Sequence, residues 1–305
     1  MFYPFTKSAR RNKRAAKEAH IVNQLRFAQY EVYYREKVNE SKLSGIGNSV
    51  PENITVSLTT YGPRIEIVYL TIESLMQQGL KADRIILCLA KSEFSEVDLP
   101  IALKNQRERG LEILFCDEDI GPYTKFYYTL QKYPDDILIT VDDDFIYPNV
   151  TVDSLYRAYL KGPKFIHCNR AHQMLLTKSG CLLPYNKWNF DKAPNEATFC
   201  TFPTGVGGVL YFPGSLDDAV LDKKTFLKLA PNSDDVWLKA MSLKKLVKCS
   251  RVKNQFIFNK KAVSIPGSQV VSLKRDNKNR KTGNDLAISN VFGKYDLYPI
   301  LEASS

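Results

Sequence analysis

The chain has few of the residues that cross-link small or secreted proteins. Its 305 residues include six cysteines, scattered without a CxxC pair, and only three histidines. Zinc-site and disulfide spacings are therefore missing, and the cysteines are expected to be small buried side chains in a reducing cytosol. No run approaches the roughly 20 apolar residues that a membrane-spanning helix needs, and the first residues lack the apolar stretch of a signal peptide. We expect a cytoplasmic protein.

Positive charge is in excess and gathers toward both ends of the chain. The formal net charge is +10. Residues 1–17 hold six Lys and Arg before the first acid, Glu18, and residues 239–281 hold thirteen against the single acid Asp276. A basic flank at each end of a nearly neutral middle suggests an anionic surface as one partner and an anionic ligand as the other.

The hydrophobic pattern separates a helical N-terminal extension, residues 1–50, from a larger domain, residues 51–305. Residues 7–42 predict a helix whose apolar positions 21, 25, 28 and 32 form one stripe. The glycine- and proline-containing stretch 44–53 then predicts a linker.

Strands and helices alternate in the first half of the larger domain. Apolar runs predict strands at 54–58, 84–90, 111–116 and 136–141, and helical patterns lie between them at 65–78, 97–110 and 123–133. Near-continuous apolar strands separated by helices indicate a mostly parallel sheet with helices on both faces, which is an α/β fold.

Three consecutive aspartates follow the fourth predicted strand. Asp142 and Asp144 project to one side and Asp143 to the other. They stand at a carboxyl end of the sheet, where open α/β sheets bind ligands. Oxygen-only ligands at this spacing suit Mn²⁺ or Mg²⁺, which also bind phosphates. We therefore expect a metal site at Asp142 and Asp144; the alternative for such a sequence is a solvated acidic turn.

Four stretches together resemble the nucleotide-sugar glycosyltransferases of the GT-A fold. They are SLTTYGPRI (57–65), VDDDFIYP (141–148), TGVGGVLYFPGSL (204–216) and SDDVWLKAM (233–241). More narrowly, the chain resembles the family-2-like bacterial enzymes of capsule and lipopolysaccharide synthesis. The resemblance implies a Rossmann-like nucleotide-binding half at 54–148 and an acceptor-binding half at 149–300. It also implies metal-dependent transfer from a nucleotide-diphosphate sugar to a saccharide or lipid-linked saccharide.

The loop after the first strand lies over the nucleotide in the resembled family. Its side chains are suited to hydroxyl hydrogen bonds, stacking and bidentate phosphate binding. The resemblance thus implies a donor-binding set of Thr59, Thr60, Tyr61, Arg64, Asp119, Lys125, Asp143, Arg280 and Lys281. A plain turn at Gly62-Pro63 is the alternative for the first loop, and solvated positions are the alternative for Lys125 and for the basic segment with Arg275, Arg280 and Lys281.

The other motifs imply an acceptor pocket and a base. Gly205, Gly207 and Gly208 let the backbone approach a bulky ligand, and Trp188 is expected to stack on a sugar. Ser233 is predicted to cap a helix that begins with Asp234 and Asp235. An acid at this helix start deprotonates the acceptor in inverting members of the family, and the match favours Asp235 over Asp234. His172 is a candidate third metal ligand, although a structural histidine is the alternative.

Two other functions fit part of the sequence. A sugar nucleotidyltransferase would use the same sheet and metal. It would require a glycine- and arginine-rich loop directly after the first strand, and TTYGPRI is a poor version of such a loop. A nucleic-acid-binding protein would use the basic ends but leave the aspartates unexplained, so no nucleic-acid partner is expected. For the N-terminal helix, a basic end and an apolar stripe predict peripheral membrane association on an anionic bilayer; packing on the domain or on a second copy is the alternative.

Overall fold

The computed structural model describes the chain except for residues 1–6, 254–257, 259–260, 269–282 and 304–305. The described helices are α1 (Lys7–Glu40), α2 (Val68–Met76), α3 (Ile101–Glu108), α4 (Thr124–Lys132), α5 (Thr151–Lys161), α6 (Lys223–Leu229), α7 (Asp234–Lys244), α10 (Asn284–Tyr295) and α11 (Tyr298–Glu302). The described strands are β1 (Ile54–Thr59), β2 (Arg84–Ala90), β3 (Leu111–Cys116), β4 (Ile137–Thr140), β5 (Phe145–Ile146), β6 (Ile166–Cys168), β7 (Ala171–Gln173), β8 (Thr201–Pro203), β9 (Val209–Tyr211), β10 (Cys249–Arg251) and β11 (Val263–Ser264).

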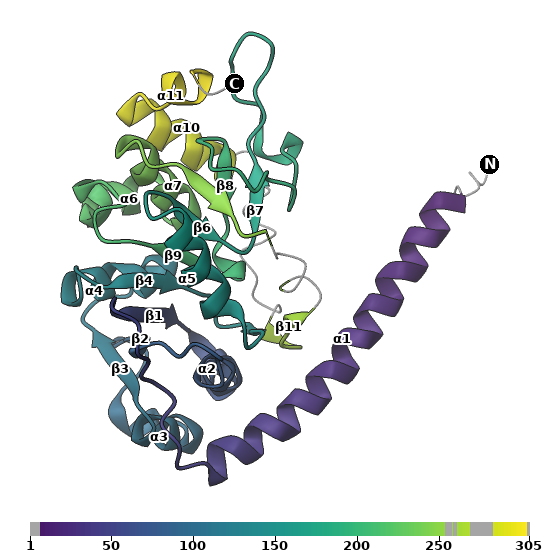
Figure 1. Cartoon of the computed structure of the whole chain (residues 1–305), viewed down its shortest axis with the longest axis vertical. Helices are drawn as coiled ribbons and strands as arrows, with labels where there is room; N and C mark the ends of the chain where they lie inside the picture. Colours follow the sequence, from purple (N-terminus) through teal and green to yellow (C-terminus); the bar gives the residue numbers. More distant parts are fainter. Residues whose placement is uncertain (1–6, 254–257, 259–260, 269–282, 304–305) are drawn as a thin grey trace.

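A seven-stranded sheet with the order β10-β6-β9-β4-β1-β2-β3 forms the centre of the molecule. Its pairs are parallel except for β9, which runs antiparallel to both of its neighbours. Helices flank the sheet (Figure 1), and the central strands β1, β2 and β4 are almost wholly buried. The α/β fold class with a mostly parallel sheet and an N-terminal helix, predicted from the sequence, is confirmed.

The strand order creates a crevice at one edge of this sheet. The chain lays down β1, β2 and β3 toward one side and then returns to place β4 on the other side of β1. Connections that leave two neighbouring strands in opposite directions open a gap at their carboxyl ends, where α/β proteins bind ligands. Thr59 ends β1 and Thr140 ends β4, so the loop after β1 and the triple aspartate after β4 face the same gap.

Prolines shift the starts of two helices from the predicted positions. The helix predicted from residue 65 begins as a 3₁₀ turn, Gly62–Glu66, that contains Pro63, and α2 itself starts at Val68. Likewise α3 starts at Ile101, directly after Pro100, rather than at residue 97. Proline lacks a backbone N–H and is therefore favoured at or before the first helical position.

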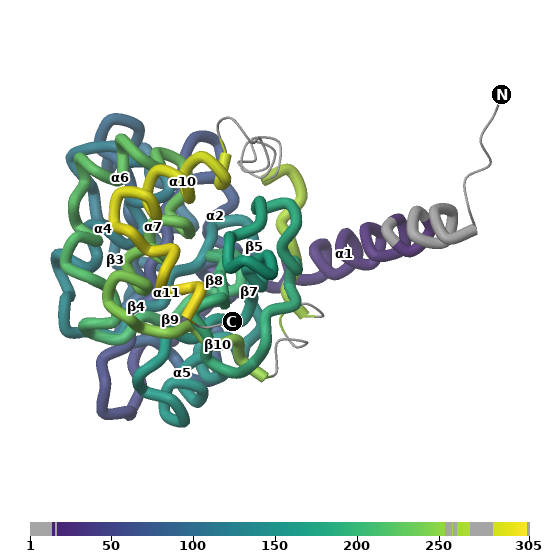
Figure 2. The backbone as a smooth tube through the Cα atoms, turned by 90° about the horizontal axis from the view of Figure 1, so that it is seen from above, coloured from purple at the N-terminus to yellow at the C-terminus, as the bar shows by residue number. Residues whose placement is uncertain are grey.

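The long helix α1 packs on the domain with a different face from the predicted stripe. Its partly or fully buried aromatic residues Phe27, Tyr30 and Tyr34 join a small core with α2, β5 and β11. Ile21 and Leu25, two positions of the predicted stripe, are instead 44% and 67% exposed. The N-terminal part of α1 extends away from the domain in both views (Figures 1 and 2). Among the described residues, no helix has the length and apolar character to cross a membrane.

Candidate active site

A cavity of about 1110 Å³ opens at the carboxyl ends of β1 and β4. Its walls come from the loop after β1, the triple aspartate, the start of α4, the start of α7 and the loop that precedes β9. Side chains from β7 and the following loop close one end, and Asn23 of α1 reaches the wall as well. The volume slightly exceeds the usual range for ligand pockets, about 300–1,000 Å³.

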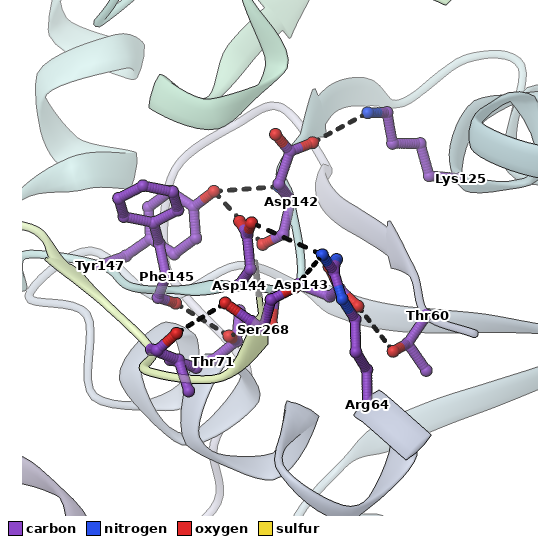
Figure 3. Close-up of polar contacts among 11 residues, drawn as sticks. Thr60, Arg64, Thr71, Lys125, Asp142, Asp143, Asp144, Phe145, Tyr147 and Ser268 are labelled. Carbon is purple, nitrogen blue, oxygen red and sulfur yellow. Dashed lines mark hydrogen bonds and ion pairs between the residues drawn. The ribbon is translucent and has the colours of Figure 1, made fainter. Parts of the chain in front are cut away.

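Asp143 is held by the loop after β1 rather than by solvent. Thr60 donates from its Oγ1 to Asp143 Oδ2 at 2.6 Å, and Arg64 donates to Asp143 Oδ1 at 2.6 Å (Figure 3). Asp143 and Thr60 are both buried. The Arg64 guanidinium also lies over the Tyr61 ring, 4.8 Å from its centroid. Two residues predicted to contact the donor thus fix the turn that carries the aspartates.

The backbone of the aspartate turn is fixed from two further directions. Thr71 of α2 donates from its Oγ1 to the carbonyls of Asp143 and Phe145, at 2.9 and 2.8 Å. The Ile265 N–H donates to the Asp144 carbonyl at 2.9 Å. Arg64, which lies 4.0 Å from the Asp144 carboxylate, also donates to the Ser268 carbonyl. The turn therefore presents its carboxylates from a rigid backbone.

Lys125 joins the aspartate turn to the start of α7. Its Nζ lies 3.0 Å from Asp142 Oδ1 and 2.8 Å from Asp234 Oδ2, and its side chain is only 7% exposed. Burial lowers the pKa of Lys125, but the carboxylates of Asp142, Asp234 and Asp235 outweigh that effect and hold it well above its usual value. A buried ammonium held in its charged form thus lies between Asp142, a predicted metal ligand, and Asp234, the second candidate for the base.

Asp235 faces the same centre from the first turn of α7. Its Oδ1 accepts a hydrogen bond from the Gly205 N–H at 3.0 Å. A Cβ added at Gly205 would lie 3.0 Å from Asp142 Oδ1 and 3.1 Å from Lys125 Nζ, so a larger residue at this position would have to displace these two side chains slightly. Ser233 occupies the N-cap position as predicted, but the capping bond is absent because its hydroxyl donates to Asn284 Oδ1 at 2.9 Å.

Burial and neighbouring carboxylates raise the pKa values of Asp144 and Asp235. Burial, and then the neighbouring Asp142 and Asp143, raise the pKa of Asp144 to about 7. Burial, and then Asp234, raise the pKa of Asp235 to about 8. Five carboxyl groups share this centre with the two cations Arg64 and Lys125. Because a nearby positive charge favours the ionised form of a carboxyl, these oxygens suit an added hard cation.

Tyr147 is a site residue that the sequence reasoning missed. Its buried hydroxyl accepts a hydrogen bond from the Asp142 N–H at 2.9 Å (Figure 3). The same hydroxyl donates to the Val206 carbonyl at 3.1 Å. It therefore ties the aspartate turn to the glycine loop. The only signal in the sequence was the position of the tyrosine in VDDDFIYP, where an aromatic residue is easily taken for simple core packing.

The structure brings most of the predicted donor residues to the cavity. Its wall includes Thr59, Thr60, Tyr61, Arg64, Asp119 and Lys125. In addition to the contacts described above, Thr59 donates from Oγ1 to the Cys88 carbonyl, and Asp119 accepts the Gly121 N–H. Arg275, Arg280 and Lys281 lie outside the described residues.

The predicted acceptor residues need correction. Trp188 is 4% exposed, packs against Tyr185 and Phe202, and is not part of the cavity wall. Gly207 is required because a Cβ there would lie 2.7 Å from Arg170 Cβ, and Gly208 has a φ of +82°, which favours glycine. Internal packing and backbone geometry therefore explain these three residues. The aromatic side chains that line the cavity are instead Tyr61, Phe145, Tyr185, Phe190 and Phe258.

His172 lines the cavity but not as part of a metal cluster. Its Nδ1 accepts the Asp191 N–H at 3.1 Å, and its ring packs 4.4 Å from the Phe190 ring. In the described parts of the chain, no three His, Cys, Asp or Glu side chains are grouped as a metal site. The prediction that His172 completes a site with Asp142 and Asp144 therefore does not match this geometry, and a buried structural histidine accounts for its contacts.

Comparisons with known proteins give structural likenesses only. No protein-family model matches the chain, and no curated protein matches it. A mannosyltransferase from Pyrobaculum calidifontis, solved with GDP-Man and Mn²⁺, matches 93% of this chain and 79% of its own, with a TM-score of 0.48 and 12% identity. S. aureus TarS 1–349, solved with UDP, matches 66% of this chain and 58% of its own, with a TM-score of 0.43 and 14% identity. Glucosyl-3-phosphoglycerate synthase from Mycobacterium tuberculosis, solved with Mn²⁺, UDP-glucose and phosphoglyceric acid, matches 39% of this chain with a TM-score of 0.31 and 17% identity. The match spans less than half of that enzyme, 43% of its length.

Proposed function

We propose that the chain is a metal-dependent glycosyltransferase of the GT-A type, moving a sugar from a nucleotide-diphosphate donor to a saccharide hydroxyl. The observation that carries this proposal is the convergence of two acidic turns on one cavity. The turn after β4 contributes Asp142 and Asp144, and the start of α7 contributes Asp235. Lys125 and Gly205 bind these two turns together.

Asp142 and Asp144 are the residues that would hold Mn²⁺ or Mg²⁺. When bound, the ion would neutralise the negative charge of the diphosphate leaving group, a Lewis-acid contribution. We leave Asp143 out of this set because Thr60 and Arg64 each bind one of its oxygens. Its role is to hold the turn, so that its two neighbours face the cavity from a fixed backbone.

Asp235 is the proposed general base. Its carboxylate would accept the proton of the acceptor hydroxyl as the hydroxyl oxygen attacks the anomeric carbon, an inverting displacement. The Gly205 N–H fixes Oδ1, which leaves the orientation of the carboxyl group defined. A pKa of about 8 lies close to neutral pH, where a base combines a useful ionised fraction with a strong pull on the proton.

The two ends of the cavity differ in a way that suits a donor and an acceptor. Tyr61 and Asp119, near the ends of β1 and β3, offer a ring and a carboxylate for the base and ribose of a nucleotide. Tyr185 and Phe190 offer an aromatic wall at the other end, and such walls stack on sugar rings. We assign the saccharide acceptor to this second end.

The N-terminal part of α1 supports a finer proposal, peripheral association with the inner face of the cytoplasmic membrane. The sequence has six Lys and Arg before Glu18, and the N-terminal part of α1 extends away from the domain. The adjoining face includes Ile21 and Leu25, both exposed. Each basic residue near an anionic surface contributes about 1 kcal/mol. This location would suit a lipid-linked acceptor in capsule or lipopolysaccharide synthesis.

A transfer assay tests the proposed reaction. Purified protein is incubated with UDP- and GDP-sugars and a saccharide panel, with Mn²⁺ or with a chelator, and products are identified by mass spectrometry. The expected product is a metal-dependent glycoside whose anomeric configuration, by NMR, is opposite to that of the donor. Asp235→Asn is expected to lower kcat by about 10²-fold or more. Formation of a nucleotide sugar from a nucleoside triphosphate and a sugar phosphate would instead identify a nucleotidyltransferase.

A flotation assay tests the membrane proposal. The intact chain is expected to float with vesicles that contain anionic phospholipid and to be released as salt is raised, because screening weakens charge attraction. Uncharged phosphatidylcholine vesicles are the control. Failure to bind anionic vesicles at low salt would contradict the membrane proposal and leave the transfer reaction untouched.

A further inference from the structure

The helix α1 contributes a side chain to the active-site cavity. Asn23 donates from Nδ2 to the Ser264 carbonyl at 3.0 Å, and its Oδ1 accepts the Ser264 N–H at 3.1 Å. The two residues are 241 positions apart in the sequence. Paired bonds of opposite direction to one residue are what a neighbouring antiparallel strand would make. The side chain of Asn23 therefore completes the free edge of β11.

Strand β11 in turn supports the aspartate turn. Ser264 is paired with Phe145 in the β11–β5 ladder, and the next residue, Ile265, donates its N–H to the Asp144 carbonyl. A little farther on, the Ser268 carbonyl accepts a hydrogen bond from Arg64. The short segment 263–268 thus lies between Asn23 on one side and the predicted metal-binding turn on the other.

Apolar packing strengthens the same connection. Tyr34 of α1, Leu70 of α2, Ile146 of β5, and Val263 and Ile265 around β11 form one buried cluster. This cluster is separate from the two large clusters that cover the faces of the main sheet. A two-residue strand pair has little stability of its own, so its position depends on such external support.

We propose that Asn23 is a positioning residue of the active site: by holding β11 against β5, it fixes the backbone of Asp144 and the guanidinium of Arg64 for binding of a divalent cation and a diphosphate. The helix α1 is then part of the catalytic domain. The choice of ligand rests on the proposed function, but the link from Asn23 through β11 to Asp144 and Arg64 does not. It follows that removing α1, or displacing it, weakens donor binding without touching any residue that contacts the donor.

The test compares Asn23→Ala with Asn39→Ala in the full chain. Asn39 is an exposed residue of the same helix, so the two variants share the chemical change and the gain in helix propensity. Hydrogen–deuterium exchange is expected to be about three- to tenfold faster for the Ser264 and Ile265 amides in Asn23→Ala alone, the scale of one lost hydrogen bond. The apparent Kd for Mn²⁺ with UDP or GDP is expected to rise about three- to tenfold in that variant, with an unchanged Tm.

Three outcomes bear on the proposal. Unchanged amide exchange, or faster exchange with unchanged Mn²⁺ and nucleotide affinity, would overturn it. If Asn23→Ala and Asn39→Ala lose Tm and affinity to the same extent, the helix has a merely structural role and the proposal is also overturned. If Asn23→Ala is too poorly folded to measure, Asn23→Asp replaces it. This variant keeps the acceptor oxygen and loses the amide donor, so its amide exchange and its Kd should change in the same direction but by less. Absence of nucleotide binding by the unsubstituted chain would count against the proposed function, while the exchange result would still decide the link.

Discussion

Replacing Lys125 by methionine should destabilise the protein in a pH-dependent manner. Lys125 is the buried cation between Asp142 and Asp234, at 3.0 and 2.8 Å. Methionine fills a similar volume but leaves the 12% exposed Asp234 side chain without this positive charge. Removing one partner of a buried ion pair typically costs about 3–5 kcal/mol, because a charge is left uncompensated.

Protonation of the carboxyl sets an upper limit on this cost. Burial already raises the pKa of Asp234, and Lys125 lowers it, so the variant should raise it further. Keeping one aspartic acid protonated costs about 1.4 kcal/mol per pH unit above its unfolded pKa of about 3.9. The limit is therefore about 4 kcal/mol at pH 7 and about 1.5 kcal/mol at pH 5. Because the folded variant binds more protons than the unfolded chain in this range, its stability falls as pH rises.

Urea unfolding of metal-free protein at pH 5 and pH 7 measures this difference. Lys132→Met is the matched control, since Lys132 lies on the same helix, is 46% exposed and pairs with Glu112; its loss should cost less than about 1 kcal/mol at both pH values. A Lys125→Met variant as stable as the control at pH 7, or one whose deficit grows as pH falls, would refute the reasoning.

Three further predictions follow from contacts around the site and from one buried ion pair elsewhere. Tyr147→Phe should cost about 1–3 kcal/mol in urea unfolding, because the Asp142 N–H and the Val206 carbonyl lose a buried partner; a neutral effect would show that water replaces the hydroxyl. Gly205→Ala should leave Tm nearly unchanged but lower kcat at least about tenfold, because the new Cβ displaces the neighbouring Asp142 and Lys125; full activity would contradict the crowding. Arg109→Met should cost about 3–4 kcal/mol at pH 7, because the fully buried Glu73 carboxyl loses the guanidinium at 2.8 Å; stability equal to that of the parent chain would contradict this.

The sequence predicted the sheet well because the residues that mark each strand and its ends lie next to one another in the chain. The strands 84–90 and 111–116 have the predicted bounds, since continuous apolar runs between charged or glycine residues mark both ends. The helices shifted where Pro63 and Pro100 moved their starts, an effect of single residues that a periodic pattern does not resolve. The second half was not assigned in detail, because strands of two or three residues carry almost no periodicity.

The sequence named both the acids and the cations that line this cavity, but not the contacts between them. Arg64 and Lys125 were expected to bind the donor and Asp142 and Asp144 to bind a metal, whereas Arg64 and Lys125 contact the three aspartates directly. Lys125 meets Asp234 across more than a hundred residues of sequence, and no local pattern reports such a contact. The same limit applies to Asn23 and Ser264, where only the assembled fold shows the pairing.

The stripe on α1 shows a different limit. Apolar positions 21 and 25 follow helical periodicity, and so do the residues that actually pack, Phe27, Tyr30 and Tyr34. A helix with two apolar faces gives two valid patterns, and the sequence alone does not tell which face meets the domain.

The most direct test of the proposed metal-dependent donor site is a calorimetric titration of UDP and GDP into the chain, with Mn²⁺ and with a chelator, repeated for Asp144→Asn. The proposed function predicts that one nucleotide binds in the presence of Mn²⁺ and that binding is lost both with the chelator and in the variant. Equal affinity with and without Mn²⁺, or an Asp144→Asn variant that binds as tightly as the parent chain, would contradict it.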